Sequence, residues 1–475
     1  MQAKNHGLRR ELKLRDLVPM QIVLIFSLIW SGFAAKQGSS QIALWFIAIV
    51  LFYLPLAAVV MKLSRAVPEE GGVYQWVKAG LSPFAGYMAA WNITLYAVFV
   101  FAGTGSALAN GFAWAAGPAG SWMATSKPVA LALTAAFCVV AYVVNVRGLH
   151  FAKWLTNGTS LLWIATFLIV LYLLIKAWTS ALPLAHASLS LAWPSFSLLG
   201  VSVLSKMAIG ALSGFEGSAV FAEECRKPEN DVARSVLIAA PLIALMYILG
   251  TAALLAYTSS ANVDLAAPVQ QLMNAGFGGS GLGRAFTLLA VLALTIATTV
   301  GCIIYIGMVA RLPMVAGWDG LLPAWWSELH PKFRTPSKAV GAVALSVLLM
   351  GAFSLLGAGN QEAFQATTAA GVASICIMYL LLFGAVLLGF RLHSLGLGFG
   401  IRLAALAAFL VALVSLAFQI VPLGEVASPA VFAVKVALAI CAANGLGAYL
   451  YWRGTQRVRA LAALSAGHSP VSDRV

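Results

Sequence analysis

Long runs of apolar residues follow one another along almost the whole chain. A helix needs about 20 predominantly apolar residues to cross a bilayer, and runs of this length recur with polar connections between them. They predict an all-α integral membrane protein with twelve transmembrane helices. The expected spans lie near residues 17–36, 42–63, 82–108, 128–146, 155–177, 199–222, 235–257, 284–310, 338–357, 364–389, 402–420 and 430–452.

The connections between the spans differ in length and in charge. Those at 358–363 and 421–429 are short and poor in charge, whereas 63–80 and 311–338 are long enough to hold helices at the inner membrane face. The composition, 61% hydrophobic and 9% charged, excludes a soluble domain. Because no Gly-rich phosphate loop is present, transport driven by ATP hydrolysis in this chain itself is excluded as well.

The formal net charge of +14 would suggest a nucleic-acid partner in a soluble protein. Here the basic residues follow the membrane topology instead, because 23 of the 29 Lys and Arg fall on the cytoplasmic side if the N-terminus is inside. We therefore expect an inner-membrane protein with cytoplasmic tails at 1–16 and 453–475 and no nucleic-acid partner. The tails can also touch anionic lipid, although topology alone explains their charge. The basic residues outside this pattern are Lys36, Lys127, Lys176, Lys206, Arg284 and Lys435.

Residues that usually carry catalysis or bind metals form no recognisable group. The five cysteines lie in spans or on the inner side, without the spacing of a disulfide framework or of metal ligands. The six histidines are mostly in loops or tails, and no His/Asp/Ser constellation accompanies them. We expect no enzyme activity, no catalytic residue, no metal and no cofactor.

One ionisable residue, Glu216, lies between Gly214 and Gly217 inside the apolar run 199–222. A carboxylate within a span is costly, so it usually faces the bundle interior and marks a path or a site. The glycines weaken the helix at the same place. Broken helices at mid-membrane form the substrate sites of many transporters, so the sequence indicates a transport site here.

A related pattern occurs in the first span, where Trp30-Ser31-Gly32-Phe33 lies at the depth of Ser213-Gly214-Phe215-Glu216 in the sixth. Five spans separate the two patterns, so they have opposite orientations in the membrane. This arrangement is typical of an inverted repeat with discontinuous first helices. We expect a leucine-transporter-like core at 17–389, made of repeats 17–177 and 199–389, and two additional helices at 402–452.

Three motifs, at 68–76, 214–228 and 319–336, occur in an order and spacing that resembles the amino acid–polyamine–organocation superfamily. The Pro-Glu-Glu-Gly-Gly-Val-Tyr run is similar to the bacterial glutamate/GABA exchanger branch. The resemblance covers residues 15–455. It implies twelve helices, a five-plus-five inverted core, and alternating access around a site between helices 1, 3, 6, 8 and 10.

The chain departs from the family pattern at two places. Trp30-Ser31-Gly32 stands where the family usually has Gly-Ser-Gly, and the stretch 157–163 of helix 5 has no lysine, although some members carry one there in place of a sodium ion. The substrate pose and the coupling ion are therefore open. Thr298 and Thr299 on helix 8 could form a sodium site, or could bond back to their own helix.

A zwitterionic substrate needs two opposite poles in a small, dry site. Free backbone N–H groups at the start of a half-helix favour an anion, so we expect Ser31, Gly32 and Phe33 to hold the carboxylate. Unwound carbonyls around 212–215 would take the ammonium group. The alternative for Ser31 and Gly32 is close packing of helices by small residues.

The remaining candidates have a functional and a structural interpretation. Glu216 is a substrate or proton ligand, a brace for the unwound backbone, or a buried carboxylate paired with a lysine. Phe215, Trp30 and Phe33 form an aromatic gate or simply core packing, and Tyr96 offers a polar edge on helix 3. Lys36 and Lys206 form a positive outer vestibule, or extend to the interface.

We therefore expect a secondary active transporter that moves a neutral or acidic amino acid by proton symport or exchange. One alternative is a transporter-like receptor or partner-dependent subunit that binds an amino acid without net transport. Another is transport of a polyamine or other organocation. A homodimer is left open as a partner.

Overall fold

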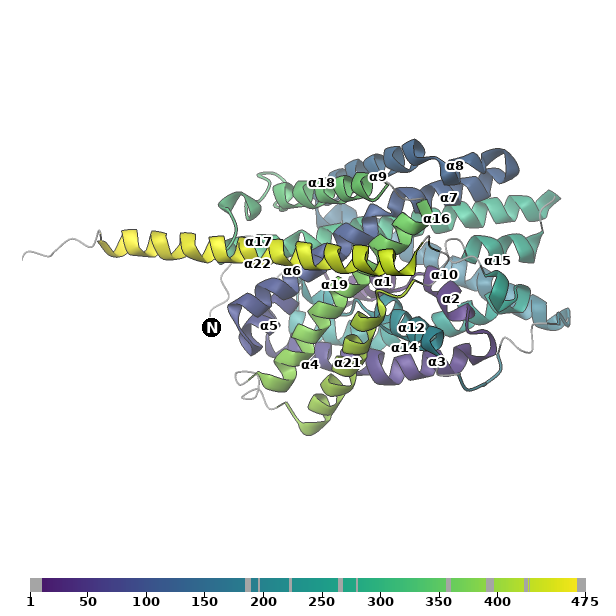
Figure 1. The fold of residues 1–475 in the computed structure, drawn as a ribbon, viewed down its shortest axis with the longest axis horizontal. Helices are drawn as coiled ribbons and strands as arrows, with labels where there is room; N and C mark the ends of the chain where they lie inside the picture. Colours follow the sequence, from purple (N-terminus) through teal and green to yellow (C-terminus); the bar gives the residue numbers. More distant parts are fainter. Residues whose placement is uncertain are drawn as a thin grey trace, which may run out of the picture.

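The computed structural model describes residues 11–183, 189–194, 197–221, 224–263, 268–278, 281–355, 360–389, 397–422, 426 and 428–467. Most of the predicted N-tail, the end of the C-tail and residues 222–223 of the second motif lie outside the described residues. Within the described ranges the regular structure is entirely helical, apart from an isolated bridge between Leu12 and Cys225. The long helices run side by side as a bundle (Figure 1).

Ten helical stretches of the described chain are long and apolar enough to cross a membrane, and each coincides with a predicted span. The prediction of a multi-pass helical protein is confirmed. The helices that form these stretches are α3 (Gln41–Ala48) with η2 (Ile49–Tyr53) and α4 (Leu54–Ala66), α6 (Pro83–Ala102) with α7 (Thr104–Ala116), α9 (Lys127–Arg147), α10 (Leu149–Thr179), α14 (Pro228–Tyr257), α16 (Gly281–Val309) with α17 (Arg311–Trp318), α18 (Ser337–Ser354), α19 (Asn360–Leu388), α21 (Phe399–Phe418) and α22 (Pro429–Gly467).

The other two predicted spans are broken. α1 (Leu14–Ile25) and α2 (Ile29–Ala35) pass the same test only as a pair and meet at an angle of 49°. The span predicted at 199–222 consists of α12 (Leu198–Lys206), η4 (Met207–Ala211) and α13 (Glu216–Ala219), with an unwound stretch before α13. The two discontinuous helices are therefore present, whereas the count of twelve spans stays a prediction.

The break in the first span lies at 26–28, four residues before the position that Gly32 predicted. No glycine or proline occupies 26–28. Tyr247 of α14 holds the break, because its hydroxyl accepts a hydrogen bond from Ser27 N–H at 3.1 Å and donates one to the Ile25 carbonyl at 2.9 Å. Trp30, Ser31, Gly32 and Phe33 all lie within α2, which corrects the sequence prediction.

The break in the sixth span lies where Gly214 predicted it. Gly214 has a φ of +126°, a conformation that costs glycine little. A Cβ atom there would lie 2.9 Å from Cγ1 of Ile25, so the two breaks touch. Gln21 of α1 joins them further by donating to Ser218 Oγ at 2.8 Å and to the Phe215 carbonyl at 3.4 Å.

The three motifs meet at the end of the bundle that carries the N-terminus, where Figure 1 draws α5 (Val73–Gly80) and α17. The Tyr74 hydroxyl of the first motif donates to the Asp319 carboxylate of the third. Arg311 forms a bidentate ion pair with Glu224 and lies 3.8 Å from Glu70. Gly71 N–H donates to the Val220 carbonyl at 3.2 Å. Both predicted loop helices exist, since α5 lies within 63–80 and α17 begins the 311–338 connection.

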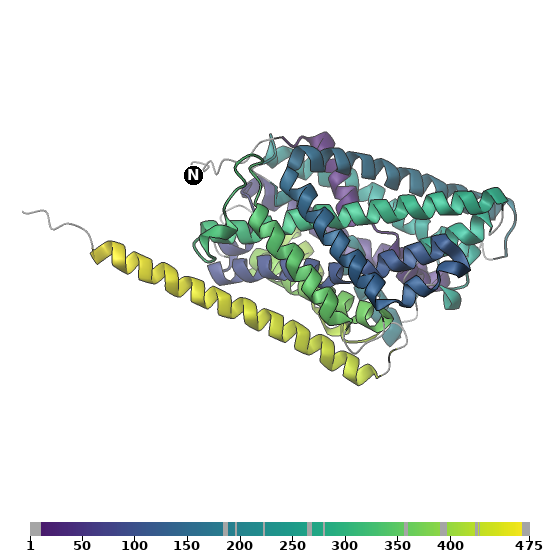
Figure 2. The ribbon, with the colours of Figure 1, turned by 90° about the horizontal axis from the view of Figure 1, so that it is seen from above.

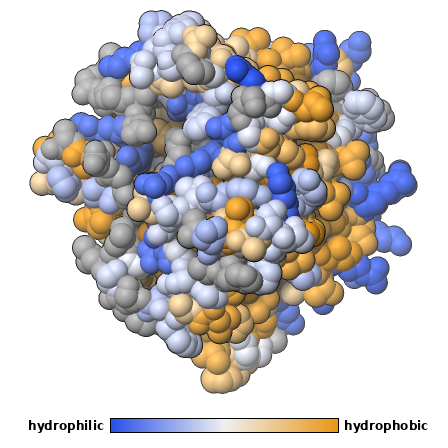
Figure 3. Space-filling view, turned by 90° about the vertical axis from the view of Figure 1, so that its right-hand side faces the viewer, coloured by the Kyte–Doolittle hydropathy of each residue, from blue (hydrophilic) through white to orange (hydrophobic). Residues whose placement is uncertain are grey.

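The opposite end carries α15 (Pro268–Phe277) and α8 (Trp122–Thr125). Figure 3 looks onto this end, where pale and blue polar residues cover the middle and apolar residues gather toward the lower and right flanks. α22 runs along the outside of the bundle (Figure 2), and only 17% of the residues in its spanning window are buried. The exposed apolar residues suit a surface in contact with lipid.

Candidate functional site

A cavity of about 210 Å³ lies against both helix breaks. The α1–α2 break forms one wall with residues 26–28, and Gly210 and Ser213 border it from the sixth span. α6, α7, α10, α16 and α19 complete the wall, and Pro268 to Gln270 of α15 lie at the end away from the N-terminus. The discontinuous helices thus share one chamber.

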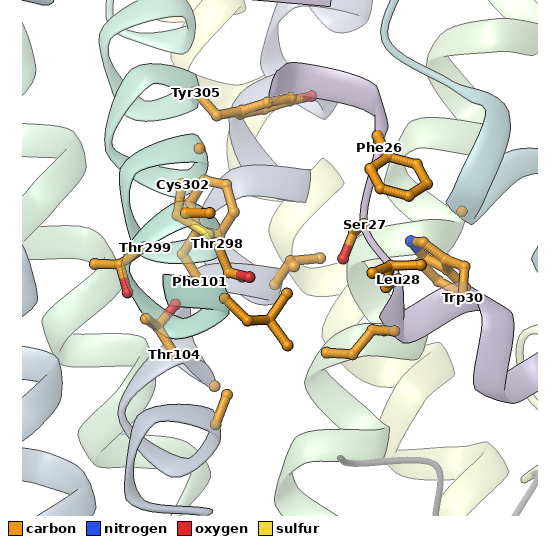
Figure 4. Close-up of a pocket in the computed structure, with 18 of the residues that line it drawn as sticks. Phe26, Ser27, Leu28, Trp30, Phe101, Thr104, Thr298, Thr299, Cys302 and Tyr305 are labelled. Carbon is orange, nitrogen blue, oxygen red and sulfur yellow. The ribbon is translucent and has the colours of Figure 1, made fainter. Parts of the chain in front are cut away.

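The described lining contains no Asp, Glu, Lys, Arg or His residue. Its polar side chains are mostly hydroxyls. Ser27 and Thr298 lie on opposite sides of the chamber, with their oxygen atoms directed into the space between them (Figure 4). Thr299 instead donates to its own helix, at 2.7 Å from the Thr295 carbonyl. A ligand in this chamber meets neutral groups only.

The backbone at the first break offers further polar groups. The N–H groups of Trp30 and Ser31 donate to the carbonyls of Ser27 and Leu28 at 3.1 Å, so the first amides of α2 bond within the break itself. The start of α2 precedes the predicted cradle at Ser31, Gly32 and Phe33, and the Ser31 amide is already bonded. The binding role of Ser31 and Gly32 stays a prediction.

Four of the predicted site residues line the cavity: Trp30, Phe33, Ser213 and Tyr96. The rings of Trp30 and Phe33 lie 5.1 Å apart, and that of Tyr96 lies 5.5 Å from Tyr305. A Cβ on Gly210 would lie only 2.2 Å from the indole of Trp30, so that ring packs directly on the sixth span. Trp30 and Phe33 therefore lie at the chamber wall, which is where a gate would have to be.

Glu216 is buried behind the chamber and does not line it. Its Oε2 accepts from the Gly214 N–H at 3.3 Å and its Oε1 accepts from the Tyr379 hydroxyl at 2.9 Å. Phe215 is buried with its ring 4.7 Å from Tyr53, as core packing requires. These contacts favour the brace interpretation of Glu216 and the packing interpretation of Phe215.

The two predicted vestibule lysines lie apart from the central cavity. Lys36 donates to the Ala261 carbonyl at 3.0 Å, and Lys206 donates to the Val421 carbonyl at 2.6 Å. Lys36 is partly exposed, whereas Lys206 is buried and lines a second, smaller cavity. The structure therefore gives the two lysines different surroundings.

Sequence reasoning missed several lining residues. Ser27, Thr104 and Phe364 carry no motif, and their only signal is a polar or aromatic residue inside an apolar run. Trp163 of α10 also lines the cavity, and its buried indole N–H has no acceptor among the described residues. Its ring lies 5.2 Å from Phe26 in an edge-on arrangement.

Comparison with known proteins agrees with this arrangement. A family model described as "Amino acid permease" matches residues 18–442. An uncharacterized transporter of Legionella pneumophila is 24% identical over 70% of this chain and 70% of its own. The low-affinity putrescine importer PlaP of Escherichia coli is 26% identical over 74% and 72%, and the aspartate/glutamate permease AcaP of Lactococcus lactis is 22% identical over 50% and 51%.

Among solved structures, that of MhsT in complex with L-phenylalanine matches with a TM-score of 0.56. It covers 84% of this chain and 97% of MhsT, at 14% sequence identity, so it bears on the fold alone. The expected leucine-transporter-like fold is confirmed, while the glutamate/GABA branch stays a prediction. The chain belongs to the amino acid permease family of the amino acid–polyamine–organocation superfamily, and it is a membrane transporter rather than an enzyme.

Proposed function

We propose that this protein is a secondary active transporter of a zwitterionic amino acid, working by proton symport or exchange in the inner membrane with both termini cytoplasmic. The observation that carries the proposal is the chamber at the two helix breaks, whose described lining has no charged side chain. The family supports a small organic substrate, but its members include carriers of both amino acids and diamines.

Electrostatics separates these two substrate classes. Burying a charge without a partner is costly. A diamine would bring two positive charges to a chamber with no carboxylate in its described wall. A zwitterion carries its own counter-charge, and its poles can be met by backbone dipoles at the breaks, as in transporters with discontinuous helices. The polyamine alternative is therefore disfavoured.

The position of the chamber supports transport by alternating access. It extends from the breaks toward α15, while the Arg311 cluster packs the end that carries the N-terminus. With cytoplasmic termini, this arrangement corresponds to an outward-facing state. Only net movement of substrate separates a transporter from a receptor, so uptake into proteoliposomes distinguishes the two.

Calorimetric titration of the purified protein tests the binding step. Alanine, glutamine, glutamate, arginine and putrescine would be compared with wild-type protein and with Ser27→Leu, whose larger side chain fills part of the chamber. We expect zwitterionic amino acids to bind wild-type protein and to lose at least tenfold in affinity with Ser27→Leu. Tighter binding of putrescine than of any amino acid would contradict the proposal.

A further inference from the structure

A second cavity, of about 40 Å³, lies beside the central chamber. A cavity needs roughly 10–15 Å³ to hold one water molecule. This cavity has room for several atoms of that size, and so for a carboxylate group. The two cavities share the residues Trp30, Phe33, Phe364 and Thr368 in their walls. The two spaces are therefore neighbours that have these four residues in common.

Lys206 is the one charged residue in the described lining of either cavity. Only 7% of it is exposed, and among the described residues its Nζ contacts the Val421 carbonyl at 2.6 Å without any carboxylate partner. An ammonium group has three donors, and removing it from water without a counter-ion is costly. The cavity beside Lys206 thus has space for an anion that no described residue supplies.

Gln419, just after α21, gives a second and independent sign of an unfilled polar site. It is fully buried and lines the same small cavity. Its Nε2 donates to the Ser415 carbonyl at 3.0 Å, whereas its Oε1 has no donor among the described residues. The unpaired Oε1 needs a donor, so a water molecule that bridges Oε1 and a bound carboxylate would satisfy both groups.

We propose that the small cavity is a carboxylate subsite, and that the preferred substrate is an amino acid with an acidic side chain. The inference rests on the proposed function, because the α-amino and α-carboxyl groups remain at the helix breaks. The side-chain carboxylate passes between the shared aromatic residues and pairs with Lys206. This ion pair would make the site prefer an acidic amino acid to a neutral one of the same shape.

Trp30 is the side chain that controls this connection. Its indole packs on Gly210, where a Cβ would lie 2.2 Å away, and its ring lies 5.1 Å from Phe33. Trp30 and Phe33 border both cavities, so in the proposed binding mode these rings move aside to admit the side-chain carboxylate. The aromatic gate expected from the sequence would thus lie between the chamber and Lys206.

Pairs of substrates with the same shape and different charge test the subsite. Glutamate and glutamine, and aspartate and asparagine, would be titrated by calorimetry into wild-type protein, Lys206→Met and Lys176→Met. Lys176 is the matched control, because it also donates to a backbone carbonyl, Gly276 at 2.8 Å, but lines neither cavity. We expect at least a tenfold preference for the acidic member in wild type and Lys176→Met, and none in Lys206→Met.

A second variant keeps the lysine and therefore remains informative if Lys206→Met does not fold. Gln419→Glu supplies a carboxylate inside the cavity, so it should raise the thermal unfolding midpoint and remove the preference for acidic substrates. Equal binding of glutamate and glutamine to wild type, or an unchanged preference in both variants, would overturn the subsite. If glutamine and alanine bind while the acidic preference is absent, the proposed function stands and the subsite fails; if no amino acid binds, the proposed function itself fails.

Discussion

At the scale of single residues, the structure separates side chains that line the chamber from those that hold its frame. The sequence left Glu216 open as a ligand, a brace or a partner of a lysine, and in the structure both of its oxygen atoms are used, by the Gly214 N–H and by Tyr379. A glutamate that satisfies the unwound backbone keeps the break in place. We therefore expect its loss to affect the fold of the site rather than proton coupling alone.

The first prediction follows from these two hydrogen bonds. Glu216→Gln keeps one acceptor oxygen instead of two, and bonds to charged groups contribute about 1.5–3 kcal/mol each. Substrate counterflow and uptake driven by a pH gradient should fall together, with a lower thermal midpoint. Tyr379→Phe removes the hydroxyl that donates to Glu216, so it should also lower the thermal midpoint. Retained counterflow with loss of only the gradient-driven uptake would instead make Glu216 the proton carrier.

Two tryptophans allow a matched prediction about unpaired polar groups. The indole N–H of Trp45 donates to Thr251 at 3.0 Å, whereas that of Trp163 has no acceptor among the described residues. Trp45→Phe should lower the free energy of unfolding by about 1 kcal/mol through the lost hydrogen bond, in addition to the loss of packing. Trp163→Phe loses packing alone, so it should be the less destabilising of the two. Denaturant unfolding in mixed micelles compares them, and the reverse order would refute the assignment.

At the scale of elements, the two broken helices differ in how far their sequence predicts them. The second break follows from local chemistry, because Gly214 adopts a φ of +126° that other residues avoid. The first break has no such residue and is held by Tyr247, more than two hundred positions away. The sequence placed the first break at Gly32 because glycine weakens a helix, but Gly32 lies inside α2. Apolar runs thus locate helices, whereas a break held by tertiary contacts has no local signal.

The packed end of the bundle gives a prediction about an ion pair between elements. Arg311 contacts Glu224, Glu70 and the Gly307 carbonyl, and its guanidinium lies 4.4 Å from the ring of Phe221. Burial, with these carboxylates nearby, raises the pKa of the Cys225 thiol well above its ordinary value. The thiol thus stays neutral and adds no further charge to the cluster.

Arg311→Met should therefore remove the bidentate partner of the buried Glu224 carboxylate, at a cost of about 3–5 kcal/mol. The control is Lys435→Met, whose 2.8 Å pair with Glu362 is 48% and 20% exposed and should contribute less than about 1 kcal/mol. Unfolding in mixed micelles measures both, and an equal, small effect of the two substitutions would contradict the structural role of the cluster.

At the scale of the whole molecule, the bundle holds a neutral chamber between two broken helices that contact each other directly. The sequence predicted the spans, the discontinuous helices and the family. It predicted only part of the lining, because Ser27, Thr104 and Trp163 come together only through packing of helices distant in sequence. The account of function depends on that lining, since its lack of charged side chains in the described wall selects zwitterions over diamines.

The most direct test is uptake by proteoliposomes that contain this chain alone. Labelled amino acids and labelled putrescine would be supplied at equal concentration, with matched empty liposomes and with unlabelled substrate inside. We expect saturable counterflow of a zwitterionic amino acid, competition by other amino acids, and no accumulation of putrescine. Uptake of putrescine in preference to every amino acid, or amino acid binding without any uptake above the empty liposomes, would contradict the proposed transport of zwitterions through the central chamber.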